Sequence, residues 1–73
     1  MKAKLFDIVR TTKDVGQIKA GSIGAVVEIW EDSVLYEIEI FDEDGDTVDY
    51  VTLKYGDFVP LTPEEVSKLK TGK

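Results

Sequence analysis

The chain has 73 residues, a net charge of −6 and neither cysteine nor histidine. Without cysteine it can form no disulfide and no thiolate metal site, and without histidine it lacks the commonest general base and the commonest transition-metal ligand. At this length one small core must come from aliphatic and aromatic burial alone.

Five strands are expected in chain order, because five segments are rich in β-branched and aromatic residues and are separated by glycines and acids. The third segment is the clearest, since Tyr36, Ile38 and Ile40 alternate with Glu37 and Glu39 in the period of two that is typical of a half-buried strand. The expected strands are residues 5–11, 24–30, 34–41, 47–53 and 58–61.

The connections between these segments also have recognisable signals. A loop is expected over residues 12–22, and Glu31–Ser33 is short enough only for a hairpin. Asp42–Asp46 is predicted to be a tight turn with Gly45 at a positive φ. Pro60 predicts that the last strand lies at an edge or ends there.

The pattern changes after residue 61. Thr62 is a predicted helix cap, Pro63 occupies the first helical position, and Glu65 follows the cap by three residues, which predicts a helix to about Lys70. We therefore expect a mostly β fold, a small five-stranded SH3-like barrel over residues 1–61, with a short C-terminal helix and tail over 62–73 as part of the same domain.

The core is predicted from the apolar phase of each strand, which must face inward if the barrel closes. The predicted core residues are Val9, Val27, Ile29, Ile38, Ile40, Val51 and Leu53.

Two resemblances support this fold. Asp7–Val9, a loop that ends in Gly21-Ser22-Ile23-Gly24, and the valine-rich strand that follows are similar to the opening of SH3-like and KOW-type barrels. The two glycines suit such a loop because a Cβ would clash where the chain enters the strand.

The chain more closely resembles a family of short bacterial proteins known as domain of unknown function 4926, over roughly Leu5 to Leu61. The matching segments are Leu5–Asp7, Lys19–Gly21, Tyr36–Gly45 and Val51–Leu53. The resemblance implies the barrel fold and supplies no catalytic residues, since the family has no established activity. The genomic settings of such proteins imply that toxin-neutralising partners are among the candidate functions.

Acidic residues dominate the middle of the chain, because ten acids and no lysine or arginine lie between Glu28 and Asp49. Asp42, Asp44 and Asp46 suggest a calcium loop. An EF-hand, however, needs glycine at its sixth position and glutamate at its twelfth, where this chain has its glycine fourth and Leu53 twelfth. A solvated hairpin tip is therefore favoured over weak cation binding.

Two other patterns have a catalytic interpretation that the sequence does not favour. Glu37 and Glu39 share a strand face as an acid–base pair would, but no nucleophile or third group accompanies them. The glycines of the first loop lead into a strand and are followed by no Gly-Lys-Ser/Thr motif, so they indicate a turn and not a phosphate site. We expect no enzyme activity, no cofactor and no metal site.

The leading hypothesis is a non-catalytic, acidic protein-interaction module that binds a basic protein through Trp30, Glu37, Glu39 and Tyr50. Trp30 is predicted to share a strand face with Glu28 and Val26, and tryptophan and tyrosine are typical anchors of interfaces. A toxin-neutralising or regulatory partner of a basic protein is one concrete form of this hypothesis.

The alternatives are a KOW-like nucleic-acid-binding barrel and an accessory subunit of a larger complex. The nucleic-acid alternative needs Lys2, Lys4 and Arg10 to form one basic face with the Lys13–Lys19 loop. The net negative charge disfavours it, because phosphate repels an acidic surface.

The sequence also gives expectations about location. No apolar run approaches the ~20 residues that span a bilayer, and Asp7 interrupts the N-terminal apolar residues too early for a signal peptide. We therefore expect a cytoplasmic protein with no membrane partner and no small-molecule substrate.

Overall fold

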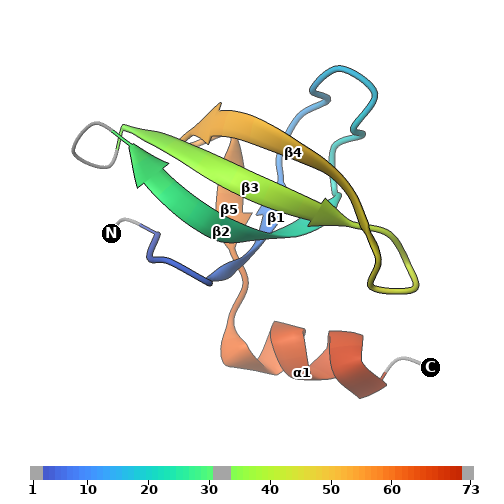
Figure 1. Ribbon diagram of the computed structural model, residues 1–73. Coiled ribbons are helices and arrows are strands. Elements are labelled where there is room, and N and C mark those ends of the chain that lie inside the picture. Colours follow the sequence, from blue (N-terminus) through green and yellow to red (C-terminus); the bar gives the residue numbers. More distant parts are fainter. Residues whose placement is uncertain (1–2, 31–33, 72–73) are drawn as a thin grey trace.

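A computed structural model describes residues 3–30 and 34–71 of the chain. These residues form five antiparallel strands in one sheet, followed by a short helix (Figure 1), so the predicted mostly β fold with a C-terminal helix is confirmed. The predicted turn at Glu31–Ser33 lies outside the described residues. The elements are β1 (Ile8–Thr11), β2 (Ile23–Trp30), β3 (Leu35–Phe41), β4 (Thr47–Lys54), β5 (Phe58–Pro60) and α1 (Pro63–Thr71).

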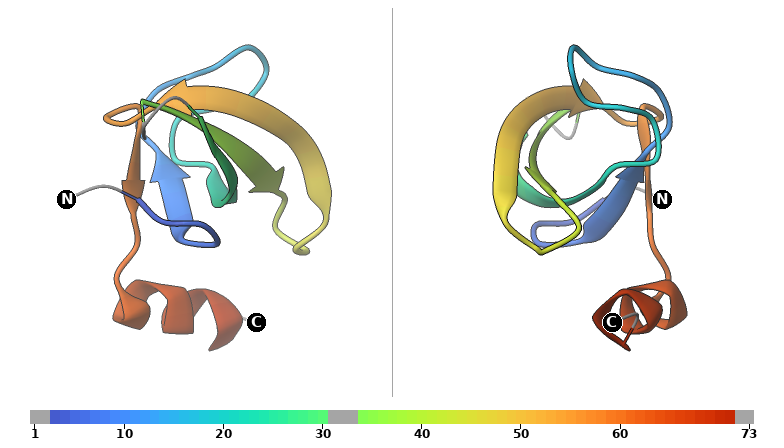
Figure 2. Two further views of the ribbon diagram at one scale, coloured as in Figure 1. Left: turned by 60° about the vertical axis from the view of Figure 1, so that its left-hand side comes forward. Right: turned by 90° about the vertical axis from the view of Figure 1, so that its right-hand side faces the viewer.

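The sheet is strongly curled but open. Its strand order is β4-β3-β2-β1-β5, and every neighbouring pair is antiparallel. Figure 2 shows the sheet wrapping around an interior, yet no pairing joins β4 to β5 within the described ranges. Closure by a continuous hydrogen-bond ladder, which the barrel expectation implied, is therefore absent there. β5 has only three residues and ends at Pro60, which has no N–H to donate, so it is an edge strand as predicted.

The core lies inside the curl. Of the predicted core residues, Val9, Ile38, Ile40 and Leu53 are buried, and Ile29 and Val51 are half-buried and pack against them. Tyr36 is also fully buried, in the phase that the alternation of β3 predicted, and its ring packs edge-on against Phe58 with the centroids 5.2 Å apart. The buried residues that the prediction did not include are Ala3, Thr11, Ile18, Ala25, Val26 and Phe58.

A β-bulge in β2 corrects the prediction for Val27. Val26 pairs with Ile38 and Glu28 pairs with Glu37, so Val27 is the extra residue with no partner on β3. A bulge of this kind inverts the alternation of the strand beyond it. Val26 is therefore fully buried, Val27 is half-buried outside the core cluster, and Trp30 does not share a face with Val26.

The first predicted strand begins three residues later than expected, at Ile8. Residues 4–7 form a turn instead, in which the Asp7 N–H donates to the Lys4 carbonyl at 3.1 Å and the Asp7 carboxylate accepts from the Lys4 N–H at 2.8 Å. Such local side-chain hydrogen bonds compete with strand formation. The turn leaves Phe6 at a φ of 70° and 73% exposed.

Two glycines hold positions that favour glycine, for different reasons. A Cβ on Gly24 would lie 2.5 Å from the Glu39 carbonyl oxygen, which confirms the clash expected where the loop enters the strand, whereas a Cβ on Gly21 would meet nothing within 4 Å. Gly45 has a φ of +86° in the turn between β3 and β4, as predicted. The Asp42 carboxylate fixes this turn by accepting from the N–H groups of Asp44 and Asp46, both at 2.9 Å.

The start of α1 is the predicted capping box. The Glu65 N–H donates to Thr62 Oγ1 at 3.1 Å, and the Thr62 N–H donates to the Glu65 carboxylate at 2.8 Å. The helix lies beyond one end of the curled sheet (Figure 2), with Val66 half-buried and Leu69 43% exposed. Among the residues described, no helix combines the length and the apolar composition that crossing a membrane requires.

Candidate functional site

The four predicted contact residues lie on one face of the sheet. Side chains along a strand alternate, and residues paired across strands point to the same side. Because Tyr36, Ile38 and Ile40 fill the core, the residues between them point outward. The outward rows join Trp30 with Leu35, Glu28 with Glu37, and Glu39 with Tyr50. We call the set Glu28, Trp30, Glu37, Glu39 and Tyr50 the acidic face.

Two carboxylates of the acidic face oppose each other directly. Glu28 and Glu37 are register partners across β2 and β3, a placement in which like charges destabilise a sheet. The Glu37 carboxylate accepts a long 3.4 Å hydrogen bond from Thr52 Oγ1, and the Glu39 carboxylate accepts a short one from Thr47 Oγ1. Hydroxyl groups, and not cations, are thus their partners on β4.

Cations contribute little to this face. The salt bridge within the described part of the chain joins Lys13 to Asp57 at 3.5 Å, away from the acidic face. Lys54 lies in the same row as Leu35 and Trp30, but it forms no ion pair with the glutamates among the residues described. The negative charge of the face is therefore mostly uncompensated among the residues that the structure describes.

Two aromatic side chains flank the glutamates. Trp30 is 45% exposed at the end of β2, and Tyr50 is 55% exposed on β4, as expected for residues outside the core. An exposed aromatic ring is a typical anchor of a protein–protein interface, and polar or charged residues usually surround such an anchor. The acidic face therefore combines unpaired charge with apolar contact area.

A pocket around the glutamates is what an acid–base pair would need. Neither Glu37 nor Glu39 lines either of the two hollows that lie beside α1. The described residues also include no group of three or more carboxylates placed to hold a metal ion, and one oxygen of the Asp42 carboxylate, Oδ1, accepts from two backbone N–H groups. The arrangement is suited to contact with positively charged groups on another surface.

The basic residues of the nucleic-acid alternative are not gathered together. Lys4 lies in the turn before β1, whereas Lys13 and Lys19 lie in the loop that follows it, at the other end of the strand (Figure 1). Arg10 lies between them on β1, and Lys2 is outside the described residues. The described residues of this alternative are thus spread along the chain from the turn before β1 to the loop after it.

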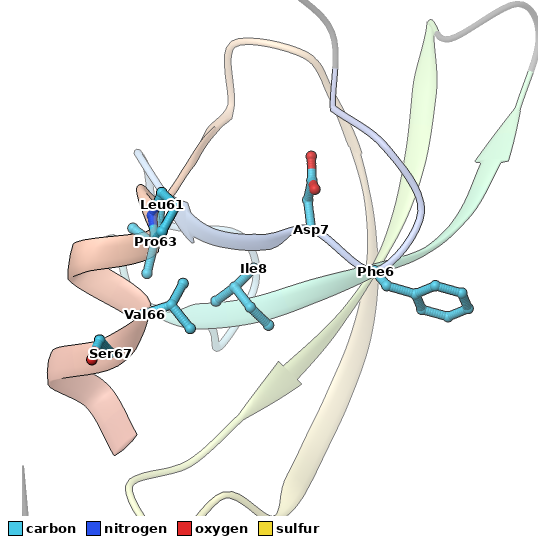
Figure 3. Close-up of a pocket in the computed structure, with 7 residues that line it drawn as sticks. All are labelled: Phe6, Asp7, Ile8, Leu61, Pro63, Val66 and Ser67. Carbon is cyan, nitrogen blue, oxygen red and sulfur yellow. The ribbon is translucent and has the colours of Figure 1, made fainter. Parts of the chain in front are cut away.

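The sequence prediction missed two hollows beside α1. Figure 3 shows the smaller, of about 390 Å³, where Ile8 and Val66 point toward one another and Phe6 points away into solvent. The larger, of about 660 Å³, shares Ile8 and Val66 and is also lined by Ile23, Phe41 and Leu69. Apolar residues at outward positions of three strands were the available signal, but their proximity to the helix depends on tertiary structure.

These features define a class of small, mostly β domain with an open, curled antiparallel sheet and an exposed acidic face. The chain matches the family model described as domain of unknown function (DUF4926) over residues 5–60. It belongs to that family, and the expected resemblance to domain of unknown function 4926 is confirmed. No curated protein and no solved structure matches the chain.

Proposed function

We propose that this domain is a non-catalytic interaction module whose acidic face binds a basic surface of a partner protein. The observation that carries the proposal is the directly opposed pair of the exposed Glu28 and the half-buried Glu37, on the outer face between Trp30 and Tyr50. A like-charge pair in this register opposes folding, and a cationic partner would remove that repulsion on binding.

A toxin-neutralising or regulatory protein is the concrete form that we propose. Many basic proteins act on nucleic acids, and an acidic surface can occupy the same cationic groups that would meet phosphate. An SH3-like fold, a bacterial origin and a cytoplasmic location belong to the same proposal. The short antiparallel strands and strong curl of the sheet support the SH3-like part of it.

The test is a quantitative pull-down with paired charge reversals. Glu37→Lys combined with Glu39→Lys should weaken capture of the partner about tenfold or more, as should Trp30→Ala, if they are hot spots of the interface. A lysine at position 37 would oppose Glu28 and turn a repulsive pair into an attractive one. Reduced binding by this double variant would therefore not result from a less stable fold, which circular dichroism would verify.

The matched control reverses the same number of charges elsewhere. Lys13→Glu combined with Lys19→Glu should leave capture of the partner unchanged, because both residues lie in the loop that precedes β2, away from the acidic face. If only the lysine pair weakens binding, and the protein retards RNA or DNA in a salt-dependent manner, the acidic-face proposal is wrong and the nucleic-acid alternative replaces it.

A further inference from the structure

The larger hollow beside α1 is an apolar groove on the outer side of the sheet. Ile8 on β1, Ile23 on β2 and Phe41 on β3 point outward, and α1 contributes Val66 and Leu69. Ile23 and Phe41 are register partners, so the sheet side of the groove is continuous. At about 660 Å³ the groove is within the usual size of ligand-binding sites, ~300–1,000 Å³.

The helix leaves this groove unfilled. Leu69 is 43% exposed although it faces the groove, and Ile8, Ile23, Phe41 and Val66 are only half-buried. The smaller hollow continues on the other side of Ile8 and Val66, between β1 and the start of α1 (Figure 3). Together the two hollows form an elongated surface that is apolar in the larger hollow, and such a surface suits a peptide segment better than a compact small molecule.

The charged residues that line the groove are acidic. Asp42 and Glu43 line it from the turn between β3 and β4, and Asp44 and Asp46 belong to the same turn. No lysine or arginine lines the groove within the described residues. Hydrogen bonds to the Asp42 carboxylate hold the turn in place, so the acidic rim is preorganised.

We propose that the groove binds a short amphipathic helical segment of the partner protein. Leucine or phenylalanine side chains of that segment would enter between Phe41 and Leu69, and its lysine or arginine side chains would meet Asp42 and Glu43. Apolar anchors at helical spacing are the usual way a peptide occupies such a groove. The inference rests on the proposed function only for the positive charge of the partner.

A second copy of the chain fits the groove less well. Each copy carries a net charge of −6, and its acids are concentrated between Glu28 and Asp49, next to the rim. Like charges brought together in an interface oppose association. Self-association through the groove is thus an outcome that would overturn the proposal.

The test uses three synthetic peptides titrated into isotope-labelled protein and followed by NMR. The first carries leucine and phenylalanine on one helical face and lysine on the other, the second replaces lysine by glutamate, and the third replaces the apolar residues by serine. The first should shift the signals of Ile23, Phe41 and Leu69, and each of the other two should bind about tenfold more weakly or worse.

Two exposure-matched variants locate the binding. Leu69→Ser should weaken binding of the first peptide about tenfold, whereas Val34→Ser should have no effect, because Val34 immediately precedes β3, at the end of the strand opposite Phe41. Leu69 and Val34 are 43% and 53% exposed, so neither change removes a core side chain. Unchanged NMR dispersion would show that both variants are folded.

The outcomes separate this inference from the proposed function. Shifts confined to Trp30, Glu37, Glu39 and Tyr50 would overturn the groove and leave the acidic face standing. Shifts in the groove that survive Glu37→Lys with Glu39→Lys, while capture of the partner also survives, would support the groove and contradict the acidic face. Concentration-dependent shifts of the groove residues without peptide would assign the groove to a second copy and overturn the inference.

Discussion

Tyr36 is the residue whose environment is most unusual. Its side chain is fully buried, and its hydroxyl has no hydrogen-bond partner among the described residues. The ring packs against Tyr55 and Phe58, with centroid separations of 6.2 and 5.2 Å, so the aromatic part is well accommodated while the polar atom is not. A buried hydroxyl without a partner costs stability.

Tyr36→Phe should therefore raise the free energy of unfolding, by up to ~1–3 kcal/mol, because it removes the unpartnered oxygen and keeps the ring contacts. Tyr50→Phe is the control and should change it little, since Tyr50 is 55% exposed. Urea denaturation measures both. A clear loss of stability in Tyr36→Phe would show that the hydroxyl has a partner, such as a bound water.

At the scale of the element, the bulge in β2 predicts different losses of stability for substitutions at the neighbouring residues Val26 and Val27. Val26→Ala should cost ~2 kcal/mol or more of unfolding free energy, because a fully buried side chain leaves a cavity, whereas Val27→Ala should cost much less. The same denaturation experiment compares the two. Equal costs, or a larger cost at Val27, would place the bulge elsewhere in the strand.

The capping box gives α1 a dependence on pH. The hydrogen bond from the Thr62 N–H lowers the pKa of Glu65 below its ordinary value of 4.5. A lowered folded-state pKa means that the stabilisation is present above the ordinary pKa and is lost as the pH falls through the lowered one. The carbon chemical shifts of residues 64–69 should accordingly lose helical character as the pH falls through this lowered pKa, which lies below 4.5.

Glu65→Gln is the control for this titration, since glutamine can accept the same hydrogen bond but has no charge to lose. Its helix should be insensitive to pH over the same interval. A Glu65 carboxyl that titrates at or above its ordinary value would contradict the capping contribution.

The elements differ in how far the sequence could predict them. β3 was predictable because Tyr36, Ile38 and Ile40 alternate with acids, and the Gly45 turn and the helix start were predictable because both depend on local hydrogen bonds. β2 was not, because residues 23–27 are apolar or small on both faces and cannot reveal a bulge. The phase of such a strand is decided by its partner, through contacts such as Gly24 against Glu39.

The two candidate sites also differ in how much of each could be predicted from the sequence. The outward direction of Glu37 and Glu39 follows from alternation alone, whereas the opposition of Glu28 to Glu37 required the register. The groove required more, because Phe41, Leu69 and Ile8 come from three distant segments that only the folded chain brings together.

For the whole molecule, added salt should raise the stability of the free domain and weaken its binding to a partner, and both effects come from the same acidic residues. The acids of the middle segment repel one another, and salt screens exposed charges. Added salt should therefore raise the thermal midpoint of the free domain. The double variant Glu37→Lys with Glu39→Lys should respond less, and a midpoint that falls with salt in the unaltered protein would contradict net repulsion.

Binding should respond in the other direction, because screening weakens attraction to a basic partner. Trp30 is the single tryptophan of the chain and lies on the acidic face, so its fluorescence reports on contact at the proposed site. The measurement is the association rate of the partner recovered in the pull-down, followed by stopped-flow fluorescence from low to high salt. We predict a rate that falls about tenfold or more as salt rises, and that is nearly flat in the double variant. A rate independent of salt in the unaltered protein would contradict the acidic face as the binding surface.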